Sequence, residues 1–227
     1  KIAQRRLVCE ISESEKEKRR YKLNRAWLAA SPIHHGDPVQ CYLHARGLTL
    51  NGFPATLRYH PALPYYEEGK LIGTFPAMLG LVTDGNNKPV TLHRTYLGNC
   101  KKANVERPKK LMSPIYPNAT EGASIKLLEP NNGRLAVAEG IETALAFHLG
   151  TQMPVWATIS AGGMERIILP PSITEITIAI DNDESGRGQN AAYILAQRLI
   201  NEGRTVKRVM PPKLGSDFAD MLMEAGL

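Results

Sequence analysis

Short apolar runs alternate with helix-like segments along the last hundred or so residues, and this alternation limits the possible folds more than any other feature. The apolar runs cover 134–139, 154–160, 175–181 and 205–212, and a segment with helical spacing follows each. The first of these segments ends at Gly150, and the last begins at Ser216, a favourable helix N-cap. Consecutive strand-then-helix units predict a parallel sheet with helices on its faces.

The preceding residues follow a different pattern. Helical spacing covers 10–29 and 39–48, whereas 53–96 contains short strand-like pieces with a hairpin signal, "DGNNKP", at 84–89. The turn-rich stretch from Pro130 to Gly133 forms a plausible boundary. We therefore predict a basic α+β subdomain over 1–130 and an α/β domain over 131–227. Because the chain starts at Lys1, we expect it to be a piece of a longer protein.

Charge is distributed unevenly between these two parts. Residues 1–130 hold 20 Lys and Arg against 11 Asp and Glu, whereas residues 131–227 hold 8 against 11. A basic part next to an acidic part indicates a surface for polyanions beside a site for cations. No apolar run approaches the ~20 residues that span a bilayer, and no signal peptide is visible.

Acidic residues follow the predicted strands where these end. Glu139 ends the first strand of the α/β domain, Asp181 ends the third, and Asp183 follows two residues later. Asp217 and Asp220 come after the fourth strand. The carboxyl ends of parallel strands meet at one edge of the sheet, where such proteins bind ligands. Clustered carboxylates repel one another, so we expect a bound Mg²⁺ or Mn²⁺ ion, with room for phosphate beside Gly140 and Gly186.

Other interpretations of these residues are possible. Each acid taken alone could be a turn or cap residue, since Asp and Asn are common where strands stop. "DNDESG" resembles the start of an EF-hand loop, but Ala192 stands where the closing Glu is needed. No phosphate-binding G-x-x-x-x-G-K-[ST] loop is present. The odd number and wide spacing of the cysteines argue against a disulfide framework and suit a reducing cytosol: Cys9, Cys41 and Cys100.

Two motifs carry a family resemblance. "VAEGIETALA", followed about 40 residues later by "IAIDNDESGRG", resembles the Toprim domain of bacterial primases, type IA and type II topoisomerases and some nucleases. With "ISAGGM" between the motifs, the sequence is most similar to primases and primase-like proteins of phages, plasmids and other mobile elements. Upstream, "CYLHARGL" and "LHRTYLGNCKKANVERPKKLMSP" resemble the start of the polymerase core and the template-binding segment of DnaG-type primases. The zinc module and helicase domain of such proteins are not visible in the chain.

The resemblance implies a role for each acidic residue. Glu139 would be a metal ligand or a general acid/base near the 3′-hydroxyl, and Asp181 and Asp183 would be the metal pair. Asp217 stands where the family often has a further acid. Glu142 could help to bind a second metal ion or could equally be an exposed first-turn residue favoured by the helix dipole. The residues whose contribution stays open are Glu142, Asp220, Gly140 and Gly186.

The same resemblance implies DNA primase activity: two divalent cations, Mg²⁺ or Mn²⁺, would support RNA primer synthesis from nucleoside triphosphates on single-stranded DNA. We expect a cytoplasmic DNA-replication protein of a bacterial host, encoded by a phage or plasmid, with a helicase as a possible partner. A Toprim nuclease and a non-catalytic nucleic-acid-binding module are the alternatives. Template or nucleotide would contact the basic segment 88–110, through Arg94, Lys101, Lys102, Arg107, Lys109 and Lys110.

Overall fold

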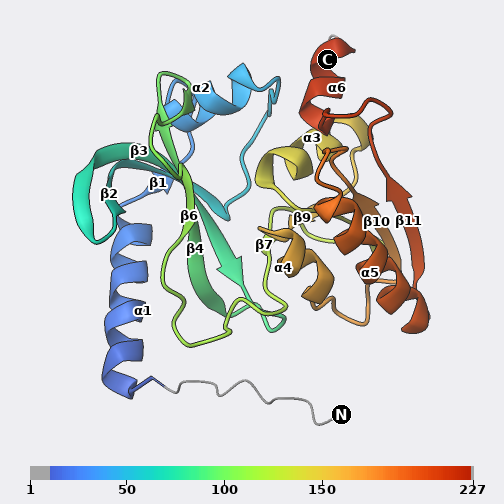
Figure 1. Cartoon of the computed structure of the whole chain (residues 1–227), viewed down its shortest axis with the longest axis horizontal. Coiled ribbons are helices and arrows are strands. Elements are labelled where there is room, and N and C mark those ends of the chain that lie inside the picture. The colour runs from blue at the N-terminus through green and yellow to red at the C-terminus, as the bar shows by residue number, and fades with distance from the viewer. Residues whose placement is uncertain (1–10, 226–227) are drawn as a thin grey trace.

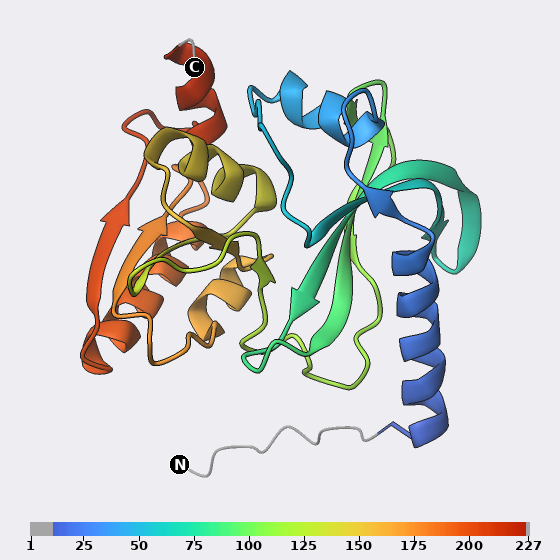
Figure 2. The ribbon, with the colours of Figure 1, turned by 180° about the vertical axis from the view of Figure 1, so that it is seen from behind.

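Two sheets lie side by side in the computed structural model, which describes residues 11–225 (Figure 1 and Figure 2). The first sheet is antiparallel, in the order β1-β2-β3-β4-β5, with β6 paired to β4. Its long central strands follow one another through hairpins, as the sequence predicts. The elements of this part are α1 (Glu13–Leu28), β1 (Ser31–Pro32), α2 (Pro38–Ala45), β2 (Leu57–Glu67), β3 (Lys70–Thr83), β4 (Pro89–Gly98), β5 (Lys101–Lys102) and β6 (Lys109–Leu111).

The second sheet has the order β11-β10-β8-β9-β7. Strands β8 to β11 are parallel, which confirms the predicted α/β fold, and β7 adds an antiparallel edge strand. That edge strand precedes the expected boundary at residue 130. The elements of this part are β7 (Ile125–Lys126), β8 (Arg134–Ala138), α3 (Ile141–Thr151), β9 (Val155–Ala157), α4 (Ala161–Arg166), β10 (Glu175–Ala179), α5 (Arg187–Asn201), β11 (Thr205–Val209) and α6 (Phe218–Glu224).

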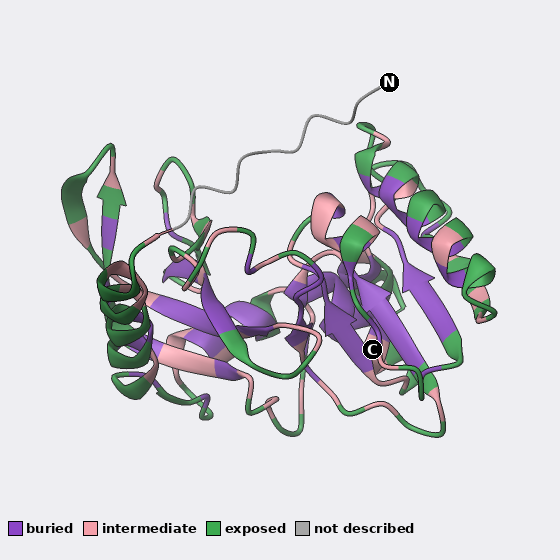
Figure 3. Cartoon of the chain, turned by 90° about the horizontal axis from the view of Figure 1, so that it is seen from below, coloured by how far each residue is buried: buried purple, intermediate pink, exposed green. Residues whose placement is uncertain are grey.

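Alternate residues of β8 face two different hydrophobic clusters. Leu135 and Val137 pack with residues of α4 and α5, whereas Ala136 and Ala138 pack with residues of α3 and α6. The cluster that contains Ala136 and Ala138 also contains residues of α2 and β3, so both sheets share it. The central strands β4, β8, β9 and β10 are largely buried (Figure 3). Because apolar burial drives folding, this shared core holds the carboxyl edge of the second sheet against the first.

Two helix boundaries differ from those predicted. The first helix of the α/β domain does not end at Gly150 but continues to Thr151 and closes with Gln152 in the left-handed conformation. The N-cap of α6 is Asp217 and not Ser216, because the Asp217 carboxylate accepts the backbone N–H of Asp220 and the Asp220 carboxylate accepts that of Asp217. This reciprocal capping box satisfies two donors at the start of the helix.

The expectation about the cysteines needs correction. Cys41 of α2 and Cys100 in the turn between β4 and β5 are joined by a disulfide. They are 59 positions apart, so their spacing in the sequence gives no sign of the pairing. Cys9 lies outside the described residues. Within residues 11–225, no helix combines the length and apolar character needed to cross a bilayer.

Candidate nucleotidyl-transfer site

Glu139 and Asp183 face the same small space at the carboxyl edge of the second sheet. Glu139 directly follows β8, and its carboxylate accepts the backbone N–H of Ala161. Asp183 lies in the loop between β10 and α5. Its Oδ1 accepts the hydroxyl of Ser185 at 2.7 Å and closes a turn. The other oxygen of Asp183 and Oε2 of Glu139 each lie 3.7 Å from the point that a β-carbon on Gly188 would occupy.

Asp181 lies between these residues and Asp217, the N-cap at the start of α6. Both of its oxygens accept the hydroxyl of Thr143, at 3.1 and 3.0 Å. Burial raises the pKa of Asp181 to about 6, and the negative charges of Asp217, Glu139 and Asp183 contribute to this rise. Burial also raises the pKa of Glu139; the N–H of Ala161 opposes this shift and Asp183 adds to it. The acids predicted from three separate strand ends therefore interact electrostatically at one edge.

The donor set at this edge fits a divalent cation. Carboxylate oxygens are the ligands of Mg²⁺ and Mn²⁺, and a cation would relieve the repulsion that raises the pKa values of Glu139 and Asp181. Within residues 11–225, however, no three Asp, Glu, His or Cys side chains surround one point closely enough to form a metal cage alone. Mg²⁺ commonly keeps several waters and uses phosphate oxygens beside one or two carboxylates. Asp181 and Asp183 would supply the protein ligands, and Glu139 would be a third ligand or a general base.

The other predicted site residues, two aspartates and two glycines, have structural roles. Asp217 caps α6 through Oδ1, and its Oδ2 accepts the guanidinium of Arg46 at 2.5 Å. Asp220 completes the same capping box. Gly186 has a φ of +66° at the start of α5, a conformation that glycine adopts without cost. Gly140 is the N-cap of α3.

Glu142 joins the two parts of the chain. Its Oε1 accepts the hydroxyl of Tyr42 at 2.6 Å, and its Oε2 accepts the ammonium of Lys109 at 2.9 Å. Although burial alone would raise it, these two partners lower the pKa of Glu142 to about 2. Glu142 is therefore a buried, ionised residue, not an exposed first-turn glutamate, and both of its oxygens are already bonded.

Two of the predicted basic residues reach the acidic edge. Lys102 and Lys109 line a cavity of about 250 Å³ that also contains Glu139, Asp181 and Asp217. Burial, then the nearby charge of Lys109, lowers the pKa of Lys102. The other four lie elsewhere: Arg94 donates to Tyr96 and to the carbonyl of Leu111, Lys110 donates to the carbonyl of Tyr66, Arg107 pairs with Glu106, and Lys101 is exposed on β5.

Several residues of the site did not emerge from the sequence. Arg46 and Tyr42 stand in the "CYLHARGL" motif, but nothing local indicates that they pair with acids more than 90 residues away. Thr143 follows the Glu-Gly motif at the spacing of one helical turn, which could have placed it beside Asp181. His93 lines the same cavity from β4.

Comparison with known proteins agrees with this geometry. Residues 134–227 match the Toprim domain family. This part of the chain therefore has the Toprim fold. Residues 17–122 match a family described as a domain of unknown function, DUF7146. Among proteins with curated functions, none matches the sequence.

Solved structures of primases share the fold of the Toprim domain and of the sheet that precedes it. A DNA primase domain from Pseudomonas aeruginosa has a TM-score of 0.56 at 14% identity over 92% of this chain and 74% of that one. The zinc-binding and RNA polymerase domains of the Aquifex aeolicus primase have a TM-score of 0.59 at 16% identity, over 95% of this chain and 59% of that one. A DnaG primase catalytic domain bound to single-stranded DNA has a TM-score of 0.57 at 15% identity, over 93% of this chain and 77% of that one. At these identities the likeness establishes the fold.

Proposed function

We propose that the chain is a primase-type nucleotidyltransferase that synthesises short RNA primers on single-stranded DNA. The observation that carries this proposal is the meeting of Glu139, Asp181 and Asp183 at one edge, opposite Lys102 and Lys109. A binding surface for nucleic acid gains nothing from clustered carboxylates. A site that polymerises nucleotides needs both the acids, to hold cations, and the lysines, to hold phosphates. We also propose that the protein acts in a bacterial cytoplasm and is encoded by a phage or plasmid.

Within this proposal, divalent cations on Asp181 and Asp183 would activate the 3′-hydroxyl and neutralise charge on the leaving pyrophosphate. Lys102 and Lys109 hold the triphosphate of the incoming nucleotide in the 250 Å³ cavity. The 3′-oxygen forms a bond to the α-phosphorus, and the bond from that phosphorus to pyrophosphate breaks. Glu139, with its raised pKa, accepts the proton of the hydroxyl. Template DNA follows the exposed lysines and arginines of segment 101–110.

Incubation with single-stranded DNA circles, the four ribonucleoside triphosphates and Mg²⁺ or Mn²⁺ tests the proposal. Wild type is expected to give short RNA products on a denaturing gel, and Asp181→Asn and Glu139→Gln to lower the yield about 100-fold or more. Glu175→Gln is the matched control, because Glu175 is an exposed acid at the opposite end of β10. Absence of product from wild type with both metals would overturn the proposal. Metal-dependent cleavage of a labelled strand would replace it with a nuclease.

A further inference from the structure

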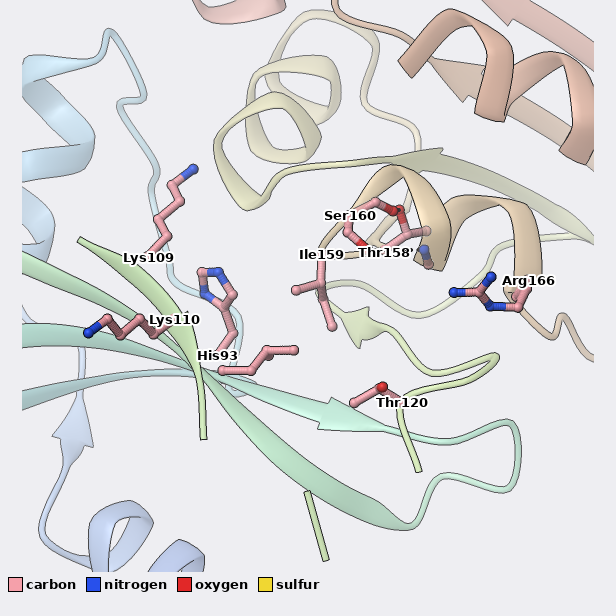
Figure 4. A pocket seen from close by; sticks show the side chains of 10 residues that line it. His93, Lys109, Lys110, Thr120, Thr158, Ile159, Ser160 and Arg166 are labelled. Atoms are coloured by element: carbon pink, nitrogen blue, oxygen red, sulfur yellow. Dashed lines mark hydrogen bonds between the residues drawn. The ribbon is translucent and has the colours of Figure 1, made fainter. Parts of the chain in front are cut away.

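A second cavity adjoins the acid-bearing one. It has a volume of about 240 Å³ and lies between the first sheet and the segment that leads from β9 into α4 (Figure 4). His93, Lys109 and Ile159 line both cavities. No carboxylate lines the second cavity, whereas four line the first. The second cavity therefore favours anions as clearly as the first favours cations.

Arg166 is the cation best placed for a ligand in the second cavity. Its guanidinium points into the cavity, whereas the ammonium of Lys110 points away from it (Figure 4). Lys110 is already bonded to the carbonyl of Tyr66 at 2.6 Å. Within residues 11–225, Arg166 is exposed, its guanidinium donates no hydrogen bond, and it forms no ion pair. The hydroxyls of Thr120 and Ser160 line the same space.

His93 lies on the wall shared by the two cavities. Only 8% of its surface is exposed, and among the described residues its Nδ1 has no hydrogen-bond partner. Burial lowers the pKa of His93 to about 4, so the ring is neutral near pH 7. In the neutral ring one nitrogen donates a hydrogen bond and the other accepts one. A buried polar atom without a partner costs free energy. Nδ1 is itself closed off, so a ligand seated in the second cavity would meet the ring of His93 through its other nitrogen, Nε2.

Ile159, together with Lys109, forms the rest of the shared wall. Its φ of +73° lies in the left-handed region, which is unfavourable for a β-branched residue. The backbone holds this conformation while the N–H of Ile159 donates to the carbonyl of Glu139 at 2.8 Å. Strain of this kind concentrates at functional sites. The wall between the cavities is thus fixed directly to the residue that would accept the proton.

We propose that the second cavity binds the phosphate groups of the nucleotide that starts the strand and supplies the 3′-hydroxyl. This inference rests on the proposed function, in which the incoming triphosphate already occupies the acid-bearing cavity. Joining two nucleotides requires both to be held at once, and the two cavities meet at Ile159 and His93. A cavity of about 240 Å³ is smaller than those that enclose whole ligands, so it suits phosphate groups and leaves sugar and base outside.

Calorimetry in EDTA tests this binding without catalysis or metal. ATP and AMP are expected to bind to wild type and adenosine not to bind, because the cavity recognises phosphate. Arg166→Ala is expected to weaken ATP binding about tenfold, the loss typical of one charge-assisted hydrogen bond. Arg134→Ala is the matched control, since Arg134 is exposed at the opposite end of β8. Equal ATP affinity of Arg166→Ala and wild type, or adenosine binding as tight as that of AMP, would overturn the proposal.

Dinucleotide synthesis on a template that specifies two different bases separates the two nucleotides. Arg166→Ala is expected to raise the KM for the starting nucleotide about tenfold and to leave the KM for the incoming one unchanged. His93→Leu, which keeps the side-chain bulk and removes the polar atoms, is expected to act in the same direction. Equal rises of both KM values would contradict a separate site. Retained ATP binding in EDTA without any synthesis would count against the proposed function alone.

Discussion

Glu142 connects the acidic edge to the sheet that carries the lysines. It belongs to α3 of the Toprim domain, whereas its partners Tyr42 and Lys109 belong to α2 and β6. A buried carboxylate with two donors is stable as the ion, and its removal leaves the partner charge uncompensated. We infer that Glu142 positions the ammonium of Lys109 at the rim of the acid-bearing cavity and does not hold metal itself.

Substitution of Glu142 by Gln is expected to lower stability in a pH-dependent way. Because the pKa of Glu142 falls from 4.5 to about 2 on folding, its ionised form stabilises the protein above pH 4.5, and this contribution disappears as the pH falls towards 2. Urea unfolding near neutral pH should show a loss of about 2 kcal/mol in Glu142→Gln, and the loss should shrink near pH 3. Tyr42→Phe, which keeps the charge, should lose less. A loss independent of pH would contradict this account.

Asp181 has the opposite effect on stability. Its pKa rises from 3.8 to about 6 on folding, so the folded protein favours the protonated form and loses stability as the pH rises through that interval. In EDTA, Asp181→Asn should therefore raise the free energy of unfolding by about 2 kcal/mol near pH 8 and leave it almost unchanged near pH 4. Mg²⁺ should stabilise wild type and not the variant. Identical pH profiles for the two proteins would refute the predicted burial cost.

Among the secondary-structure elements, α2 has the most connections to the site. It carries Tyr42 and also Cys41 of the disulfide, and Arg46 follows directly as its C-cap and pairs with Asp217. The chain then turns at Gly47, which has a φ of +73°. A β-carbon on Gly47 would lie 2.6 Å from Cγ of Met223 in α6, so the end of α2 approaches α6 as closely as a glycine permits.

Replacing Gly47 by Ala should disturb this approach. The positive φ alone should cost about 1 kcal/mol, and contact with Met223 should add about 1 kcal/mol. Gly36→Ala is the matched control, since Gly36 has a φ of +87° and no atom within 4 Å of its would-be β-carbon. The free energy of unfolding measures both losses, and hydrogen exchange of the α2 amides shows where the extra loss arises. An equal effect of both substitutions would show that the contact with Met223 yields without cost.

The elements of the Toprim domain follow from local patterns, whereas the contacts between elements do not. The runs 134–139 and 175–181 predict β8 and β10 because short apolar stretches bounded by turns form buried strands. Glu139 and Asp181 could be placed at one edge because they directly follow those strands. The pairing of Tyr42 with Glu142, 100 residues apart, depends on how the two sheets pack. No local period in the sequence encodes that packing.

At the scale of the whole molecule, the uneven charge becomes an arrangement across one site. The basic first part contributes Lys102, Lys109 and Arg46, and the acidic second part contributes the strand-end carboxylates. Because the two parts share one hydrophobic cluster, a common core holds the two walls of the acid-bearing cavity against each other. Separation of charge along the sequence therefore predicted two surfaces, but the structure brings them together as the walls of one cavity.

Within the described part of the chain, from residue 11 to 225, the disulfide is the one covalent link between distant elements of the first part. It joins α2 to the turn after β4 across 59 positions and so closes a loop that contains β2, β3 and β4. Closure of a loop of this length restricts the unfolded chain and should stabilise the protein by about 4 kcal/mol.

Reduction with dithiothreitol should lower the urea midpoint by the corresponding amount. The urea midpoint of the double variant Cys41→Ser, Cys100→Ser should match that of the reduced protein and should not change with dithiothreitol. Equal midpoints for oxidised and reduced wild type would exclude a stabilising bond. In the proposed reaction, the KM for the incoming nucleotide should also rise on reduction, since Lys102 lies two residues after Cys100 and Arg46 follows α2.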